Sequence, residues 1–231
     1  MFHHHSDPGA DGVGVAFTSA ELDLGDRQTG AARADAFARL SQSLGVPVAI
    51  VGQVHGAAVA DADQAPLVAS GLVDLGVEAD AVLTSRRGLA VAVRVADCVP
   101  ILLAAADGGA VAAVHAGRAG LLAGVIGAAV ARLRERSAAP LRAWIGPHIC
   151  GACYEVPPEL AADAAARLGV PVPRTRWGTT GIDLGAAAAR QLAEAGAAVT
   201  VVPGCTLTTP TLHSHRRDPG GGRQVGLIWR G

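Results

Sequence analysis

The chain has 231 residues, of which 50% are hydrophobic and only 3% are aromatic. This composition is typical of a globular protein, and single mixed α/β domains reach this length. The formal net charge is -1, with 19 basic and 20 acidic side chains, so the excess of positive charge typical of a general nucleic-acid binder is missing. We therefore expect one domain spanning residues 1–231, with small molecules rather than nucleic acid as its partners.

The apolar runs and the start of the chain bear on its location. No apolar run reaches the roughly 18 residues that cross a bilayer, and the polar start lacks the basic and apolar regions of a signal peptide. We therefore expect a cytoplasmic protein with no membrane partner, in which residues 1–11 are flexible. Four cysteines without an export signal argue against a disulfide framework. A cysteine with a function would then be a ligand, a nucleophile or a redox group.

Segments with strand and helix periodicity are mixed along the whole chain. In chain order the patterns predict a strand over Gly12–Phe17, a helix over Thr29–Leu44, strands over Val46–Val54, Ala81–Thr84, Ala90–Val95 and Ala110–Val114, a helix over Gly120–Arg136, a strand over Leu141–Ile145, helices over Pro158–Leu168 and Asp183–Ala195, and strands over Val199–Val202 and Gln224–Trp229. Turn residues separate the central strands, which we therefore expect to be neighbours. The predicted fold class is α/β, with a mixed sheet and packed helices.

Three of these segments end on a side chain with lone pairs that is followed by a turn. They are Gln53–Gly56, Val95–Cys98 and Val114–Gly117, and the side chains are those of His55, Cys98 and His115. Two imidazoles and a thiolate are ligands that Zn²⁺ prefers, and three protein ligands leave a fourth position open, as catalytic sites require. The pattern predicts an open metal site in which the same residues are catalytic. Spacing alone also allows two hydrogen-bonded histidines and a buried thiol.

Cys150 and Cys153 form a Cys-x-x-Cys pair. A structural zinc site needs a second ligand pair, and the sequence has none at matching spacing. A thioredoxin-like pair should open a helix after a strand, and no His-x-Glu precedes the pair, as the cytidine deaminase signature requires. We therefore predict a structural role for this pair.

Seven short segments follow one another in an order found in a known family. They are Gln53–Gly56, Ala79–Ala81, Ala96–Pro100, His115–Gly117, Ile145–Pro147, Cys153–Val156 and Arg216–Arg217. Through them, residues 50–230 resemble the YfiH or laccase-domain family, most specifically at Ala96–Pro100 and Cys153–Val156. The resemblance implies a YfiH-like α-β-α sandwich. It also implies Zn²⁺, with Cu²⁺ as an alternative, bound by His55, Cys98 and His115.

The resemblance implies one of two activities. Family members have been described as polyphenol oxidases and as purine nucleoside phosphorylases, which act on adenosine, inosine, guanosine and methylthioadenosine and also deaminate adenosine. A multicopper oxidase needs on the order of ten histidines, whereas this chain has eight, three of them at His3–His5. We therefore favour the phosphorylase, with purine nucleosides and phosphate as partners. A copper-dependent polyphenol oxidase stays as an alternative.

Arginines are the natural candidates for binding phosphate. Arg216 and Arg217 are the first candidates, although an adjacent pair of this kind can also be a solvated surface charge. Where the family usually has His-Ala-Gly-Trp-Arg-Gly, this chain has Arg118 in place of the Trp and Ala119 in place of the Arg. We expect Arg118 to bind substrate or phosphate from a different direction, in a pocket that is more open and more polar.

Two alternative hypotheses, from other functional classes, use residues of the predicted metal site. In a cysteine hydrolase or amidase, Cys98 would be the nucleophile and His115 its base, without a metal; the family resemblance implies cell-wall precursors as its substrates. A metal-dependent interaction module is the non-enzymatic reading. It fits less well, because polar strand ends converging on an open site make a poor flat binding surface.

Overall fold

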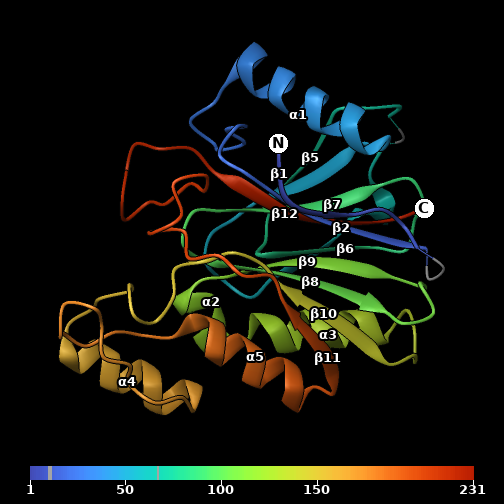
Figure 1. Ribbon diagram of the computed structural model, residues 1–231. Coiled ribbons are helices and arrows are strands. Elements are labelled where there is room, and N and C mark those ends of the chain that lie inside the picture. Colours follow the sequence, from blue (N-terminus) through green and yellow to red (C-terminus); the bar gives the residue numbers. More distant parts are fainter. Residues whose placement is uncertain (10–11, 67) are drawn as a thin grey trace.

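Two β-sheets packed face to face form the centre of the molecule (Figure 1). The computed structural model describes residues 1–9, 12–66 and 68–231. The first sheet has the order β1 (Phe2–Ser6), β2 (Val13–Thr18), β12 (Gln224–Arg230), β7 (Ala90–Val95), β3 (Val48–Gly52) and β5 (Leu72–Glu78). The second sheet has the order β11 (Ala197–Val201), β10 (Leu141–Ile145), β8 (Val99–Ala105), β9 (Val111–Ala116), β6 (Ala81–Thr84) and β4 (Val59–Asp61). Both sheets are mixed, because parallel and antiparallel pairs occur in each.

Helices cover the outer faces of the two sheets. Helix α1 (Gly30–Leu44) packs on the first sheet through Phe37 and Leu40. Helices α2 (Arg118–Ala123), α3 (Val125–Arg134), α4 (Pro158–Leu168) and α5 (Leu184–Glu194) lie on the side of the second sheet (Figure 1). The layers are therefore helix, sheet, sheet and helices. This arrangement confirms the predicted mixed α/β class, and the strands divide into two sheets rather than one.

Strand β8 shows how the core is shared between the layers. Ile101 and Leu103 pack toward the helices, whereas Leu102 and Ala104 pack between the two sheets. Since successive side chains of a strand point to opposite faces, both faces of β8 are buried. Its sequence is consequently apolar without alternation, and it was not predicted.

Two further segments differ from the prediction. The helix expected over Gly120–Arg136 divides into α2 and α3 at Gly124, whose φ of 83° lies in the left-handed region that favours glycine. Residues Phe2–Ser6, expected to be flexible, instead form β1 and pair with β2. Residues 10–11 of the segment expected to be flexible lie outside the described residues. None of the helices in the described part of the chain is both long and apolar enough to cross a membrane.

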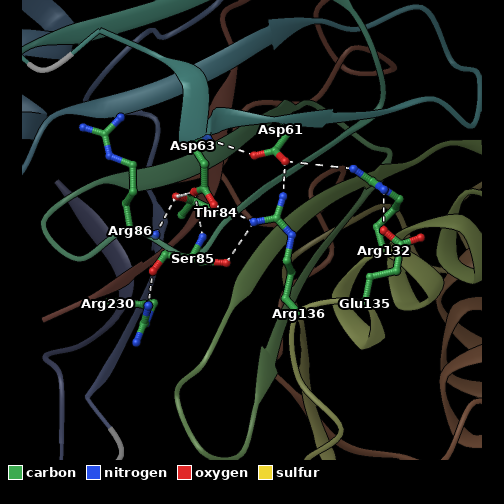
Figure 2. Close-up of polar contacts among 9 residues, drawn as sticks. All are labelled: Asp61, Asp63, Thr84, Ser85, Arg86, Arg132, Glu135, Arg136 and Arg230. Carbon is green, nitrogen blue, oxygen red and sulfur yellow. Dashed lines mark hydrogen bonds and ion pairs between the residues drawn. The ribbon is translucent and has the colours of Figure 1, made fainter.

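A polar network ties the edge of the second sheet to the end of α3 (Figure 2). Asp63, in the 3-10 helix that follows β4, accepts hydrogen bonds from the Thr84 hydroxyl at 2.7 Å and from the Ser85 backbone N–H at 2.8 Å. Arg136 donates to Asp63 at 2.7 Å and also pairs with Asp61. The network therefore secures the end of β6 that lies away from Asp80.

Candidate metal centre and cavity

The structure brings His55, Cys98 and His115 together at the place where the two sheets meet. His55 lies in the loop after β3, Cys98 lies in the crossover from β7 to β8, and His115 lies in β9. Their ligand atoms are all within 4.8 Å of one another. The Cys98 Sγ lies 3.8 Å from the His55 Nε2, and the two imidazole rings are 4.7 Å apart, edge to face. Three donors of the type that Zn²⁺ prefers therefore converge on one point.

A buried carboxylate, Asp80, organises two of these three side chains. Its Oδ1 accepts hydrogen bonds from the His115 Nδ1 at 2.7 Å and from the His55 backbone N–H at 2.9 Å. Its Oδ2 accepts from the backbone N–H groups of Gly56 at 2.6 Å and Val54 at 3.2 Å. Since an ionised carboxylate can only accept, His115 donates from Nδ1, and its Nε2 faces the ligand set. Asp80 thereby sets both the loop of His55 and the tautomer of His115.

The backbone at the site has unusual geometry in two places. His55 has a φ of 62° and Asp97 a φ of 95°, both in the region that favours glycine. The hydrogen bonds that Asp80 accepts from the backbone N–H groups of residues 54–56 hold His55 in this conformation. Asp97 is held through its Oδ1, which accepts from the Thr206 hydroxyl at 2.6 Å, and through its Oδ2, which accepts from the Arg216 backbone N–H at 2.7 Å. Such conformations persist where surrounding contacts fix them, and they cluster at functional sites.

Gly117 gives the ligands room to approach one another. A Cβ at this position would lie 2.9 Å from the His55 ring and 3.0 Å from the Cys98 sulfur. Both distances are shorter than ordinary carbon contacts. Residue 117 must therefore be glycine if His55 and Cys98 are to keep these positions.

The three side chains also shift each other's protonation. Burial would raise the pKa of the Cys98 thiol, but hydrogen bonds with His115 and His55 outweigh it and lower that pKa to about 6. Burial would lower the pKa of His115, but its hydrogen bonds with Asp80 and Cys98 raise that pKa to about 9. At neutral pH and without a metal, the pair is therefore a thiolate and an imidazolium. A metal ion would replace the proton on His115 Nε2.

A cavity of about 660 Å³ opens beside the ligand set. Besides His55, Cys98 and His115, its lining includes Asp26, Gln53, Arg94, Asp97, Arg118, Ala119, Ile149, Tyr154, Leu184, His215, Arg216 and Arg223. The Arg94 charge is paired with Asp26. Among the described residues, none makes a hydrogen bond or ion pair with the Arg118 guanidinium. The cavity therefore has a cation that can accept an anionic ligand.

The two predicted phosphate-binding arginines near the C-terminus occupy different environments. The Arg216 guanidinium lines the cavity, lies 5.0 Å from the centre of the Tyr154 ring, and donates to the Glu155 carbonyl at 2.9 Å. The Arg217 guanidinium is not part of the cavity lining. It donates to backbone carbonyls of the loop over residues 206–212, among them those of Thr206 at 2.6 Å and Leu212. Arg216 can meet a ligand, whereas Arg217 holds the loop together.

Sequence reasoning did not predict the supporting residues Asp80, Asp97 and Tyr154. All three lie within the segments that carry the family resemblance. A signal was present for Asp80, because an acidic residue flanked by the apolar Ala79 and Ala81 at the start of a buried strand needs hydrogen-bond partners. The hydrogen-bond partners of Asp80 and Asp97 could not be predicted, since these partners lie in segments that are distant in the sequence.

The two-sheet fold and the converging ligand set define a mixed α/β protein with one candidate His–Cys–His metal centre beside a cavity with an unpaired arginine. The chain belongs to the family described as multi-copper polyphenol oxidoreductase laccase, which it matches over residues 10–231. Similar proteins of known name are purine nucleoside phosphorylases. That of Corynebacterium glutamicum is 42% identical over 83% of this chain and 78% of its own length. That of Streptomyces coelicolor is 45% identical over 82% of this chain and 78% of its own length.

Solved structures share the fold over almost the whole chain. A protein of the DUF152 family from Neisseria meningitidis superposes with a TM-score of 0.83 at 29% identity, covering 99% of this chain and 98% of its own. YlmD from Geobacillus stearothermophilus superposes with a TM-score of 0.77 at 28% identity, covering 97% of this chain and 94% of its own. These likenesses confirm the resemblance found in the sequence motifs and the predicted fold class.

Proposed function

We propose that this chain is a single-domain, metal-dependent purine nucleoside phosphorylase. The observation that carries the proposal is that the ligand set and the unpaired Arg118 line one cavity. A volume of about 660 Å³ is in the range of small-molecule sites. The names of relatives at 42% and 45% identity supply the reaction class.

In phosphorolysis, an oxygen of phosphate forms a bond to C1′ of the ribose while the bond from C1′ to the purine nitrogen breaks. The products are ribose 1-phosphate, or methylthioribose 1-phosphate from methylthioadenosine, and the free base, which keeps the pair of electrons from the broken bond and takes up the proton that phosphate loses. The transition state resembles an oxocarbenium ion. In this chain Arg118 and Arg216 would hold the phosphate anion against the sugar, since guanidinium groups bind phosphate in a bidentate fashion. Tyr154 offers an apolar ring face in the same cavity.

His55, Cys98 and His115 would hold the metal ion, which we propose to be Zn²⁺, with Cu²⁺ as the alternative. The donor set fits Zn²⁺, because His115 presents Nε2 while Asp80 fixes its Nδ1, as carboxylates do for zinc-bound histidines. When bound, Zn²⁺ supplies a Lewis acid that can activate water or polarise an oxygen of the substrate. Asp80 orients His115, and Gly117 keeps the space between His55 and Cys98 free.

The proposed substrates are adenosine, inosine, guanosine and methylthioadenosine, and we include deamination of adenosine as a second activity. A copper-dependent polyphenol oxidase is less well supported. Within the described residues, the other group of side chains placed to bind a metal consists of three cysteines, whereas a multicopper oxidase needs imidazoles for its additional coppers.

A cysteine hydrolase or amidase is the second candidate, and the pKa of about 6 at Cys98 favours it. The thiolate and the imidazolium of His115 form the pair that such an enzyme uses. Its substrates would include amides of cell-wall precursors.

The decisive experiment measures release of free base from the four nucleosides, with and without phosphate, using metal-loaded and metal-free protein. We expect free base and the matching sugar 1-phosphate, which is methylthioribose 1-phosphate for methylthioadenosine, only when both phosphate and metal are present, and we expect ammonia from adenosine without phosphate. Arg118→Ala should raise the KM for phosphate, whereas the control Arg167→Ala, at an exposed pair with Asp163 on α4, should not. Full activity of the metal-free protein would contradict the proposed metal dependence. If none of the four nucleosides releases its base, the proposal that the chain is a phosphorylase is wrong.

A further inference from the structure

Three cysteines outside the cavity lie together although they are distant in sequence. Cys150 and Cys153 flank a turn after β10, and Cys205 lies in the loop after β11. Their sulfur atoms are all within 4.8 Å of one another, and all three thiols are free. The sequence analysis found no second ligand pair for Cys150 and Cys153. The structure supplies a single third cysteine instead.

The backbone around the three cysteines is already ordered for a shared ligand. The turn from Cys150 is closed by the Cys153 N–H, which donates to the Cys150 carbonyl at 2.8 Å. The Cys150 N–H donates to the Cys205 sulfur at 3.5 Å. On the other side, the Thr209 N–H donates to the Cys205 carbonyl at 2.9 Å. An N–H that points at a sulfur stabilises the thiolate form, which is the form that binds metals.

The spacing of the sulfurs suits one soft metal ion. Zn–S bonds of about 2.3 Å in tetrahedral geometry place sulfurs about 3.8 Å apart, so a shift of about 1 Å or less would close the set. Cys153 is buried at 2% exposure, and Cys150 and Cys205 are partly exposed. In the described part of the chain, no histidine or carboxylate has a ligand atom that lies within 4.8 Å of all three sulfurs. Three thiolates would therefore be the protein ligands, with a fourth position for water.

We propose that Cys150, Cys153 and Cys205 form a second metal site, for a thiophilic ion such as Zn²⁺ or Cu(I). Its role is structural, because the three sulfurs are not among the residues that line the cavity. The site would join the loop after β10 to the loop after β11. Both loops are already attached to Asp97, through the Ile149 N–H at 3.0 Å and the Thr206 hydroxyl at 2.6 Å. A metal there would fix the loops that carry Tyr154 and Arg216.

The test is metal content per chain, measured by native mass spectrometry on untagged protein saturated with Zn²⁺ and then freed of excess. Wild-type protein should hold two ions, and Cys205→Ser should hold one. Cys98→Ser is the matched control, since it makes the same chemical change at the other ligand set. The double variant should hold none. The same measurement after loading with Cu(I) in place of Zn²⁺ shows which of the two ions the three cysteines retain.

This test is independent of the proposed function, because Cys205→Ser should lose one ion whether or not Cys98→Ser does. If Cys205→Ser does not fold, thiol protection gives the answer in the Cys98→Ser background. There, Zn²⁺ should protect Cys150, Cys153 and Cys205 from alkylation. Equal alkylation with and without Zn²⁺ would overturn the proposal, as would an unchanged metal content in Cys205→Ser. A mass lower by two hydrogen atoms in the denatured, unreduced chain would show a disulfide instead, and would also overturn it.

Discussion

Replacing Asp80 by Asn should damage both the stability and the metal centre, and the structure sets the size of each effect. The Asp80 side chain is completely buried and accepts four hydrogen bonds, two at each carboxylate oxygen. Asn has nearly the same shape, but one of its two terminal atoms is an NH₂ donor. With the NH₂ in place of Oδ2, the Val54 and Gly56 N–H groups lose their acceptor; with the NH₂ in place of Oδ1, the His55 N–H loses its acceptor and His115 must change tautomer. Each buried donor left without a partner costs about 1–3 kcal/mol, so the free energy of unfolding should fall by about 1–6 kcal/mol.

The effect on metal binding follows from the tautomer of His115. If the NH₂ group faces His115, Nδ1 must accept and the proton moves to Nε2, which can then no longer bind a metal. If the NH₂ group faces the backbone instead, the loop that carries His55 loses two of its hydrogen bonds. Loss of a carboxylate behind a metal-binding histidine typically costs 10- to 100-fold in metal affinity. We expect a loss of about that size for Zn²⁺.

Urea unfolding measures the stability, and competition with a chromophoric chelator measures the Zn²⁺ affinity. Asp63→Asn is the matched control, because Asp63 accepts three hydrogen bonds, against four for Asp80, but contacts the opposite end of β6. It should lower stability and leave Zn²⁺ affinity unchanged. If Asp80→Asn binds Zn²⁺ as tightly as the wild type, then Asp80 supports the fold alone and the reasoning on the tautomer is wrong.

Four further predictions concern the same cavity. Gly117→Ala should abolish most Zn²⁺ binding in an equilibrium titration, since its Cβ would meet His55 and Cys98. The control Gly127→Ala, which has open space around it in α3, should keep the Zn²⁺ affinity and raise the free energy of unfolding by up to about 1 kcal/mol. Arg216→Ala should raise the KM for phosphate about tenfold with little change in stability, whereas Arg217→Ala should lower the free energy of unfolding by about 1–3 kcal/mol. Equal effects of the two changes on the KM would refute the assignment of Arg216 to the ligand and of Arg217 to the loop. In metal-free protein, the rate of alkylation of Cys98, followed by peptide mass spectrometry, should rise as the pH passes about 6 rather than the value near 8.5 that is usual for a thiol. The lowered pKa of Cys98 also adds to the free energy of unfolding: this contribution is complete above about pH 8.5 and is lost as the pH falls through about 6. The double change Arg118→Trp and Ala119→Arg, at two positions that line the cavity, should improve nucleoside turnover if purine nucleosides are the substrates. A drop in activity with unchanged folding would mean that Arg118 serves another substrate.

The sequence predicts the strands and helices best where burial follows a simple period. Helix α4 agrees with its predicted bounds, because it has one apolar face, a proline at its start and a glycine at its end. Strand β8 was not predicted, because Pro100 interrupts its pattern, whereas β6, β7 and β9, which are equally buried on both faces, were predicted. The division of the strands into two sheets depends on pairings between distant segments, such as β2 with β12. No local pattern records such a pairing.

The candidate site shows the same division between local and distant information. His55, Cys98 and His115 could be proposed because each stands next to a strand and because the motifs around them resemble a family. Their convergence, the four bonds of Asp80 and the separate environments of Arg216 and Arg217 depend on how loops meet in space. Cys205 illustrates this most clearly, because it lies in no recognised motif and its relation to Cys150 appears only in the fold.

The position of the proposed ligand set between the two sheets would link metal capture to the order of folding. His55 follows a strand of the first sheet, His115 belongs to the second, and Cys98 lies in the crossover between them. A collapsed intermediate with only one sheet formed therefore has an incomplete set of ligands. The ion would be captured late, after the sheets have docked, and its binding energy would favour the finished fold over every partly assembled state. Retention of the ion would thus report that both sheets have formed and docked.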